Sequence, residues 1–100
     1  MAAKYQVKGK VWLWPGDMSA WHFVHVDKKT SERIKEKHAK PRRGFGSVRV
    51  EATIGKTSWQ TSIFPDKRSG TYLLPLKASV RRTEGLSEGD LLSFTLSIGV

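Results

Sequence analysis

Alternating apolar and polar residues run through much of the chain and predict strands with one buried face. Residues 4–14 place Val7 and Val11 on one side and Lys8 and Lys10 on the other. Successive strand side chains point to opposite faces, so this stretch predicts a strand that covers a core. Alternation at residues 47–54 and short segments rich in apolar residues elsewhere predict five further strands, at residues 21–26, 47–54, 58–64, 72–74 and 91–98.

The most informative local pattern lies between Tyr72 and Phe94. Pro75 has a fixed φ and lacks an N–H, so the strand before it is expected to stop there. Residues 77–83 predict a helix of about two turns with Val80 facing the core. Gly85 then suits the left-handed position that closes a helix.

A second helix is predicted within Asp27–Lys40, with Thr30 or Ser31 as its N-cap. Ile34 is its main apolar residue, so we expect a short helix on the edge of the sheet. Six short strands with two short helices predict a mostly-β fold, a small barrel or pseudo-barrel with six or more strands. No internal sequence repeat is visible.

The length and composition favour one globular domain over residues 1–100. The chain is 38% hydrophobic and contains four Trp and four Phe, enough for one compact core. It has no Cys, which excludes disulfides and thiolate metal sites. No apolar stretch resembles a signal peptide or a membrane span, so we expect a cytoplasmic protein without membrane contact.

The net charge of +9 is concentrated in the first half of the chain. Residues 28–43 hold eight basic side chains against only Glu32 and Glu36. Such a cluster can contact phosphates, and an adjacent aromatic ring can stack on a base; a solvated charged surface is the alternative explanation. The candidate nucleic-acid residues are Lys28, Lys29, Arg33, Lys35, Lys37, Lys40, Arg42, Arg43 and Phe45.

Catalytic or metal-binding arrangements are not apparent in the sequence. His22 and His25 are three residues apart in a predicted strand, so they point to opposite faces and cannot grip one ion. Asp90 follows a glycine in a turn, where backbone N–H groups explain it without catalysis. The residues therefore favour a binding protein over an enzyme, with no cofactor and no metal.

The four tryptophans have two possible roles, in filling the barrel or in lining its mouth. Packing is the commoner role, because small barrels need large side chains in their interior. If Trp12, Trp14, Trp21 and Trp59 instead line a mouth, cations nearby would select an acidic ligand. The candidate ligand-binding residues are Trp59, Lys77 and Arg81.

A family resemblance rests on the segment from Trp59 to Asp90. Its features are Trp59-x-Thr-Ser-x-Phe-Pro, then Gly70-x-Tyr-x-Leu-Pro-x-Lys, and Gly85-Leu-x-x-Gly-Asp. The chain resembles the bacterial domain-of-unknown-function family numbered nineteen-oh-five, and the resemblance covers nearly its whole length. It implies a double-split β-barrel capped by helices, with no established activity.

The second half is also similar to the swapped-hairpin element of AbrB-type transition-state regulators. The order strand, Pro75, short helix, Gly85-Leu, Gly89-Asp and strand carries this likeness. Those regulators bind DNA as dimers whose two chains, each about half this length, share one barrel. One chain here is long enough to supply both halves, so we expect a monomer.

Three functional hypotheses follow from the sequence. The first is a binding or accessory module for an unknown anionic ligand. The second is a nucleic-acid-binding regulator that uses the basic cluster at residues 28–43. The third is an enzyme or carrier for a small acidic substrate near Trp59, Lys77 and Arg81.

Overall fold

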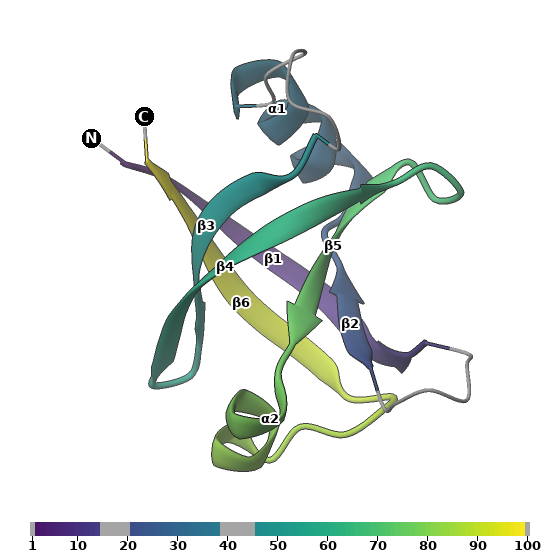
Figure 1. Ribbon diagram of the computed structural model, residues 1–100, viewed down its shortest axis with the longest axis vertical. Helices are drawn as coiled ribbons and strands as arrows, with labels where there is room; N and C mark the ends of the chain where they lie inside the picture. Colours follow the sequence, from purple (N-terminus) through teal and green to yellow (C-terminus); the bar gives the residue numbers. More distant parts are fainter. Residues whose placement is uncertain (1, 15–20, 39–45, 100) are drawn as a thin grey trace.

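A computed structural model of the chain describes residues 2–14, 21–38 and 46–99 (Figure 1). Its six strands form a closed antiparallel barrel, as the sequence predicted. The helices α1 and α2 lie at opposite ends of the barrel (Figure 1). The elements are β1 (Ala2–Leu13), β2 (His22–His25), α1 (Lys28–His38), β3 (Val48–Ile54), β4 (Thr57–Asp66), β5 (Thr71–Leu76), α2 (Ala78–Glu84) and β6 (Leu91–Gly99).

The strands follow the order β1-β2-β5-β4-β3-β6 around the barrel. β1 changes partner along its length: residues 2–10 pair with β6 and residues 11–13 with β2. β4 does the same, because residues 57–63 pair with β3 and residues 64–66 with β5. Each long strand therefore separates from one neighbour as it joins another, which creates two splits in the barrel wall.

The interior is filled by aliphatic side chains from alternate strand positions. Val24, Ile63, Leu74 and Leu96 have no measurable exposure, and Phe94 is 2% exposed. These residues come from four different strands, so the core holds the barrel together across its whole cross-section. The tryptophans are absent from this fully buried set.

α1 begins one turn earlier than the sequence indicated. Asp27 is its cap: a carboxylate oxygen of Asp27 accepts a hydrogen bond from the Thr30 backbone N–H at 2.9 Å. The prediction of Thr30 or Ser31 as N-cap was therefore wrong. Ile34 is fully buried, as expected. α2 was predicted correctly in its essentials, with Val80 buried and Gly85 left-handed at φ 66°.

The prediction that Pro75 stops the fifth strand was also wrong. β5 continues to Leu76, and Pro75 lies opposite Phe23 of β2. Pairing with β4 on the other side extends only as far as Leu73. β5 is thus paired on one side only at Pro75, the situation in which a strand tolerates proline.

The two halves of the chain repeat the same topology. The order of strands around the barrel is unchanged when the two halves are exchanged, the first being β1-β2-α1-β3 and the second β4-β5-α2-β6. Val24 pairs with Leu74 near the axis of this pseudo-twofold relation. Val11 lies beside Val24, and continuing the register of Phe64 with Leu73 by one residue places Ile63 beside Leu74.

Counting along the strands from these positions relates individual residues of the two halves. The corresponding pairs are Tyr5 with Thr57, Gly9 with Thr61, Asp27 with Lys77, Ser31 with Arg81 and Tyr72 with His22. The sequence shows no repeat because these pairs are chemically different. The repeat is therefore one of topology.

Candidate ligand-binding site

A pocket of about 350 Å³ opens where β4 and β5 separate. Trp59, Gln60 and Thr61 of β4 form one wall, and Pro75 and Leu76 of β5 form the opposite one. The start of α2 and the beginning of β2 complete the lining with Trp21, His22, Lys77, Ala78 and Arg81. Thus the three ligand-binding candidates from the sequence, Trp59, Lys77 and Arg81, border one pocket.

Two cations at α2, Lys77 and Arg81, lie on the same side. Lys77 is the N-cap and Arg81 follows four residues later, a spacing that aligns side chains along a helix. Nε of Arg81 donates a hydrogen bond to the backbone oxygen of Leu76 at 3.2 Å. This bond fixes the base of the guanidinium at the end of β5.

α2 is itself anchored to the far end of the β3–β4 hairpin. The Thr57 hydroxyl donates a hydrogen bond of 2.6 Å to a carboxylate oxygen of Glu84, the last residue of α2. A Cβ on Gly55, in the hairpin turn, would collide with the same carboxylate. Glu84 is therefore engaged away from the pocket and does not neutralise Lys77 or Arg81.

The electrostatic character of the pocket follows from its composition. Among the ten lining residues, two are cations and none is an acid. Trp59 adds a half-buried ring that packs against the core. A concave site of this kind can hold a small molecule with a negatively charged group and an apolar, flat portion.

The family comparison agrees with the resemblance seen in the sequence. Residues 8–96 match the family described as Domain of unknown function (DUF1905). The chain belongs to this family. No curated protein matches it. The DUF1905 assignment brings no activity with it, and the AbrB-type likeness stays a prediction from sequence.

In this DUF1905 chain three of the four tryptophans do not fill the barrel. Trp12, Trp14 and Trp21 lie on the side of their strands opposite to the buried Val11 and Val24. Trp21 is 60% exposed and Trp14 is 39% exposed. The expectation of interior packing is wrong for these three, and of them only Trp21 reaches the pocket.

Part of the predicted nucleic-acid surface lies on α1. Lys28, Lys29, Arg33, Lys35 and Lys37 are all exposed there, while Ser31 and Ile34 face inward. Lys40, Arg42, Arg43 and Phe45 lie outside the described residues. The exposed helix cations are compatible with a phosphate contact and with simple solvation alike.

The two strand histidines point to opposite faces, as their spacing predicted. His22 borders the pocket, whereas His25 stacks on Trp12 with ring centroids 5.3 Å apart. In the ranges that the structure describes, no three His, Asp or Glu side chains are grouped to hold a metal ion. Neither described helix is long and apolar enough to cross a membrane.

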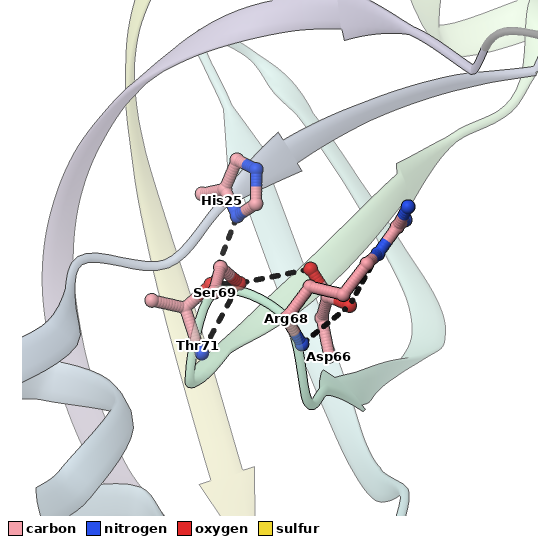
Figure 2. Close-up of polar contacts among 5 residues, drawn as sticks. All are labelled: His25, Asp66, Arg68, Ser69 and Thr71. Atoms are coloured by element: carbon pink, nitrogen blue, oxygen red, sulfur yellow. Dashed lines mark hydrogen bonds and ion pairs between the residues drawn. The ribbon is translucent and has the colours of Figure 1, made fainter.

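His25 begins a chain of polar contacts that ends at the turn after β4 (Figure 2). Nδ1 of His25 lies 2.8 Å from Oγ1 of Thr71, which is 2.7 Å from Oγ of Ser69. The Ser69 hydroxyl donates to Asp66 at 2.9 Å. Each hydroxyl has one proton, so Thr71 donates to Ser69 and the Nδ1–H of His25 donates to Thr71.

Asp66 remains ionised at the end of this chain. Burial alone would raise the pKa of Asp66, but the hydrogen bond from Ser69 and the backbone N–H and charge of Arg68 outweigh it, so the pKa is lowered. Arg68 lies 3.6 Å from the carboxylate. Asp66 therefore holds the β4–β5 turn in one conformation.

The sequence alone did not point to Gln60, Thr61 and His22. No residue pattern marks them, because they become pocket residues only where β4 leaves β5. The pairing register decides that position. Lys77 and Arg81 were accessible to sequence reasoning, since helix periodicity alone places them together.

Proposed function

We propose that this protein is a binding module for a small organic anion, with the pocket at the β4–β5 split as its site. The observation that carries the proposal is the convergence of Lys77, Arg81 and Trp59 on one pocket without a lining acid. The cations would bind a phosphate or carboxylate, and Trp59 would contact the remainder of the ligand.

Binding is favoured over catalysis by the same lining. Most acid–base mechanisms need two titratable groups of different pKa near the reacting atoms. The pocket offers His22 beside two cations and no carboxylate. A carrier or regulatory ligand site needs only recognition, which these residues supply.

The proposal can be tested by a thermal-shift screen followed by calorimetry. The panel would contain nucleoside monophosphates, sugar phosphates and aromatic carboxylates, together with uncharged analogues of the same size. We expect an anionic compound to raise the melting temperature and its uncharged analogue to have no effect. A quench of tryptophan fluorescence on binding would place the ligand near Trp59 or Trp21.

Matched variants make the result specific. Lys77→Gln removes an exposed pocket cation, whereas Lys56→Gln removes an exposed cation in the β3–β4 turn. Lys77→Gln and Arg81→Lys should lower the affinity for the anionic compound, and Lys56→Gln should leave it unchanged. Equal affinity in all three variants, or no stabilising compound in the panel, would refute the proposed site.

A further inference from the structure

Aromatic rings gather on the outer surface of the barrel beside the pocket. We call this group the aromatic face; it consists of Trp12, Trp14, Trp21 and Phe23. Phe23 is its centre, with ring centroids 5.4 Å from Trp12, 5.8 Å from Trp14 and 6.1 Å from Trp21. Phe23 is only 9% exposed, so it supports two exposed rings from beneath.

Exposed rings of this size indicate an interaction surface. Trp14 and Trp21 are 39% and 60% exposed, although Val11 and Val24 of the adjoining strands are almost fully buried. Leaving apolar area in water forgoes about 25 cal/mol per Å² of stabilisation. A contiguous apolar patch that the fold leaves uncovered commonly marks a binding site.

Cations flank the aromatic face. The guanidinium carbon of Arg68 lies 5.2 Å from the centre of the Trp14 ring, and the Arg68 side chain is 71% exposed. Lys10 is exposed and precedes Trp12 by two residues, so it lies on the same side of β1. Asp66, the acid of the adjoining turn, is occupied by Arg68 and Ser69 (Figure 2).

The cations of α1 continue this charged border. The Lys28 ammonium lies 3.9 Å from the position that a Cβ on Gly70 would take. Gly70 closes the turn that carries Arg68, so the first cation of α1 adjoins the same turn. The positive border therefore extends from Trp14 across the turn toward α1.

We propose that the aromatic face binds single-stranded nucleic acid. Bases would stack on Trp14 and Trp21, and phosphates would contact Arg68 and Lys10. Unpaired bases expose their flat faces to such rings, whereas the bases of a duplex are already stacked on one another. A neutral sugar would use the rings without the cations, and an apolar protein surface would supply no anionic partner for Lys10.

This inference is independent of the ligand proposed for the pocket. Trp21 belongs to both surfaces, so a change at Trp21 does not separate them. Trp14 and Arg68 are absent from the pocket lining, and Lys77 and Arg81 are absent from the aromatic face. Variants at these two pairs of residues distinguish the two sites.

The test is fluorescence anisotropy with a labelled oligothymidylate of about 12 nucleotides, within the usual site size for small barrels. The same strand in a duplex serves as the comparison. We expect tighter binding to the single strand and a clear loss of affinity between about 50 mM and about 200 mM salt. Trp14→Ala should weaken binding about ten-fold through loss of one stacked base.

Conservative variants separate stacking from charge. Trp14→Phe should retain most of the affinity because it keeps a ring, and Arg68→Lys should retain more than Arg68→Ala because it keeps the charge. Arg68→Ala should also reduce the slope of log affinity against log salt by about one. Lys56→Ala is a charge-matched control and should leave binding nearly unchanged. Circular dichroism would verify that each variant folds.

Several outcomes would overturn the inference. Equal affinity for duplex and single strand, or a Trp14→Ala variant that binds normally, would remove the role of stacking. Loss of binding on charge reversal of Arg33 and Lys37, with Trp14→Ala unaffected, would move the site to α1. Salt-independent binding of a neutral polysaccharide that needs Trp14 would make the face a carbohydrate platform. Self-association abolished by Trp14→Ala, detected by light scattering, would make it a contact between copies.

Discussion

The two splits of the barrel differ although the fold builds them alike. Each follows the same sequence of long strand, short strand and helix. At the β1–β2 split the wall is tightly closed, and a Cβ on Gly9 would lie 2.7 Å from both the backbone oxygen of His25 and a methyl of Val24. At the corresponding place in the β4–β5 split, Thr61 borders an open pocket.

The helices reinforce this contrast through one pair of corresponding residues. In the closed half, Ser31 is 3% exposed; its hydroxyl donates to the Val26 carbonyl and accepts the Tyr72 N–H, both at 3.0 Å. In the open half, Arg81 makes the corresponding bond to the Leu76 carbonyl. A short side chain closes the first split, and a long cationic one lines the second.

The last residue of each helix also forms a hydrogen bond with a residue near the start of a long strand. The Tyr5 hydroxyl lies 3.1 Å from Nε2 of His38, and the Thr57 hydroxyl donates to Glu84 at 2.6 Å. The shared ties maintain the scaffold, while the residues between them decide whether a split is sealed. A duplicated scaffold can thus keep one half for stability and leave the other available for a ligand.

The largest expected difference between the halves is at Ser31 and Arg81. Ser31→Ala removes the partner of a buried carbonyl and of a buried N–H, at about 1–3 kcal/mol for each unsatisfied group. We expect a loss of about 2–4 kcal/mol in the free energy of unfolding, measured by urea denaturation. Arg81→Ala should cost about 1 kcal/mol or less, because its carbonyl partner borders an open pocket that water can enter.

Ser31→Thr is the control, since it keeps the hydroxyl in a slightly larger side chain. Its stability should fall between those of the original chain and Ser31→Ala. If Arg81→Ala lowered the free energy of unfolding more than Ser31→Ala, the distinction between a closed half that stabilises the fold and an open half that binds a ligand would be wrong.

The second difference concerns how closely the strands approach. Gly9→Ala forces a methyl against backbone at 2.7 Å, so the wall must shift, and overpacking of this kind costs about 1–3 kcal/mol. Thr61→Ala should cost less than about 1 kcal/mol because its neighbours on the pocket side leave space. Urea unfolding of the two variants in parallel measures both effects. Similar losses would mean that the two splits are equally packed.

Much of the fold was predictable because it depends on local patterns. Alternation and short apolar runs identified the six strands, and Ile34, Val80 and Gly85 took the positions that helix periodicity and capping assign to them. Pro75 was misjudged because its tolerance depends on β4 having already left β5, which is a matter of register. Asp27 was missed as a cap because Asp27, Thr30 and Ser31 all have side chains that can cap a helix.

The candidate site divides in the same way. Lys77 and Arg81 could be found from helix periodicity, whereas Thr61 is indistinguishable in sequence from any other strand threonine. Alternation alone puts Trp12 and Trp14 on the same side of the strand as Lys8 and Lys10, whereas the amount of large side chain that the barrel interior could hold was not readable from the chain. Aliphatic residues, together with Tyr72 and Phe94, fill the interior, and Trp12, Trp14 and Trp21 remain outside.

The third difference lies at the N-caps. Asp27 caps α1, but Lys77 at the corresponding position makes no side-chain capping bond. Lys77→Asp should stabilise the protein by about 1 kcal/mol, because φ −71° and ψ 158° already suit a cap. The same change should abolish stabilisation by the pocket anion, since a cation becomes an acid. Thermal unfolding with and without the anionic compound reads both effects.

Asp27→Lys is the reciprocal variant and should cost about 1 kcal/mol through loss of the cap. It should leave anion binding unchanged, because Asp27 is outside the pocket lining. A Lys77→Asp protein that retained anion binding would show that Lys77 takes no part in recognition.

The smallest expected difference is in the response of stability to pH. The hydrogen bond that anchors the end of α1 involves a histidine, His38, whereas the one that anchors α2 joins Thr57 and Glu84. Burial, and then the charge of Lys37, lower the pKa of His38 below its ordinary value of 6.5. The unfolded chain therefore binds this proton more readily than the folded one, so stability rises with pH in the window just below 6.5.

Thermal unfolding followed from about pH 8 to about pH 5 should show a small fall in melting temperature as His38 becomes charged. His38→Asn should flatten that part of the profile and Thr57→Val should not, since the tie of α2 contains no imidazole. A profile unchanged by His38→Asn would assign the effect to another group and remove this distinction between the halves.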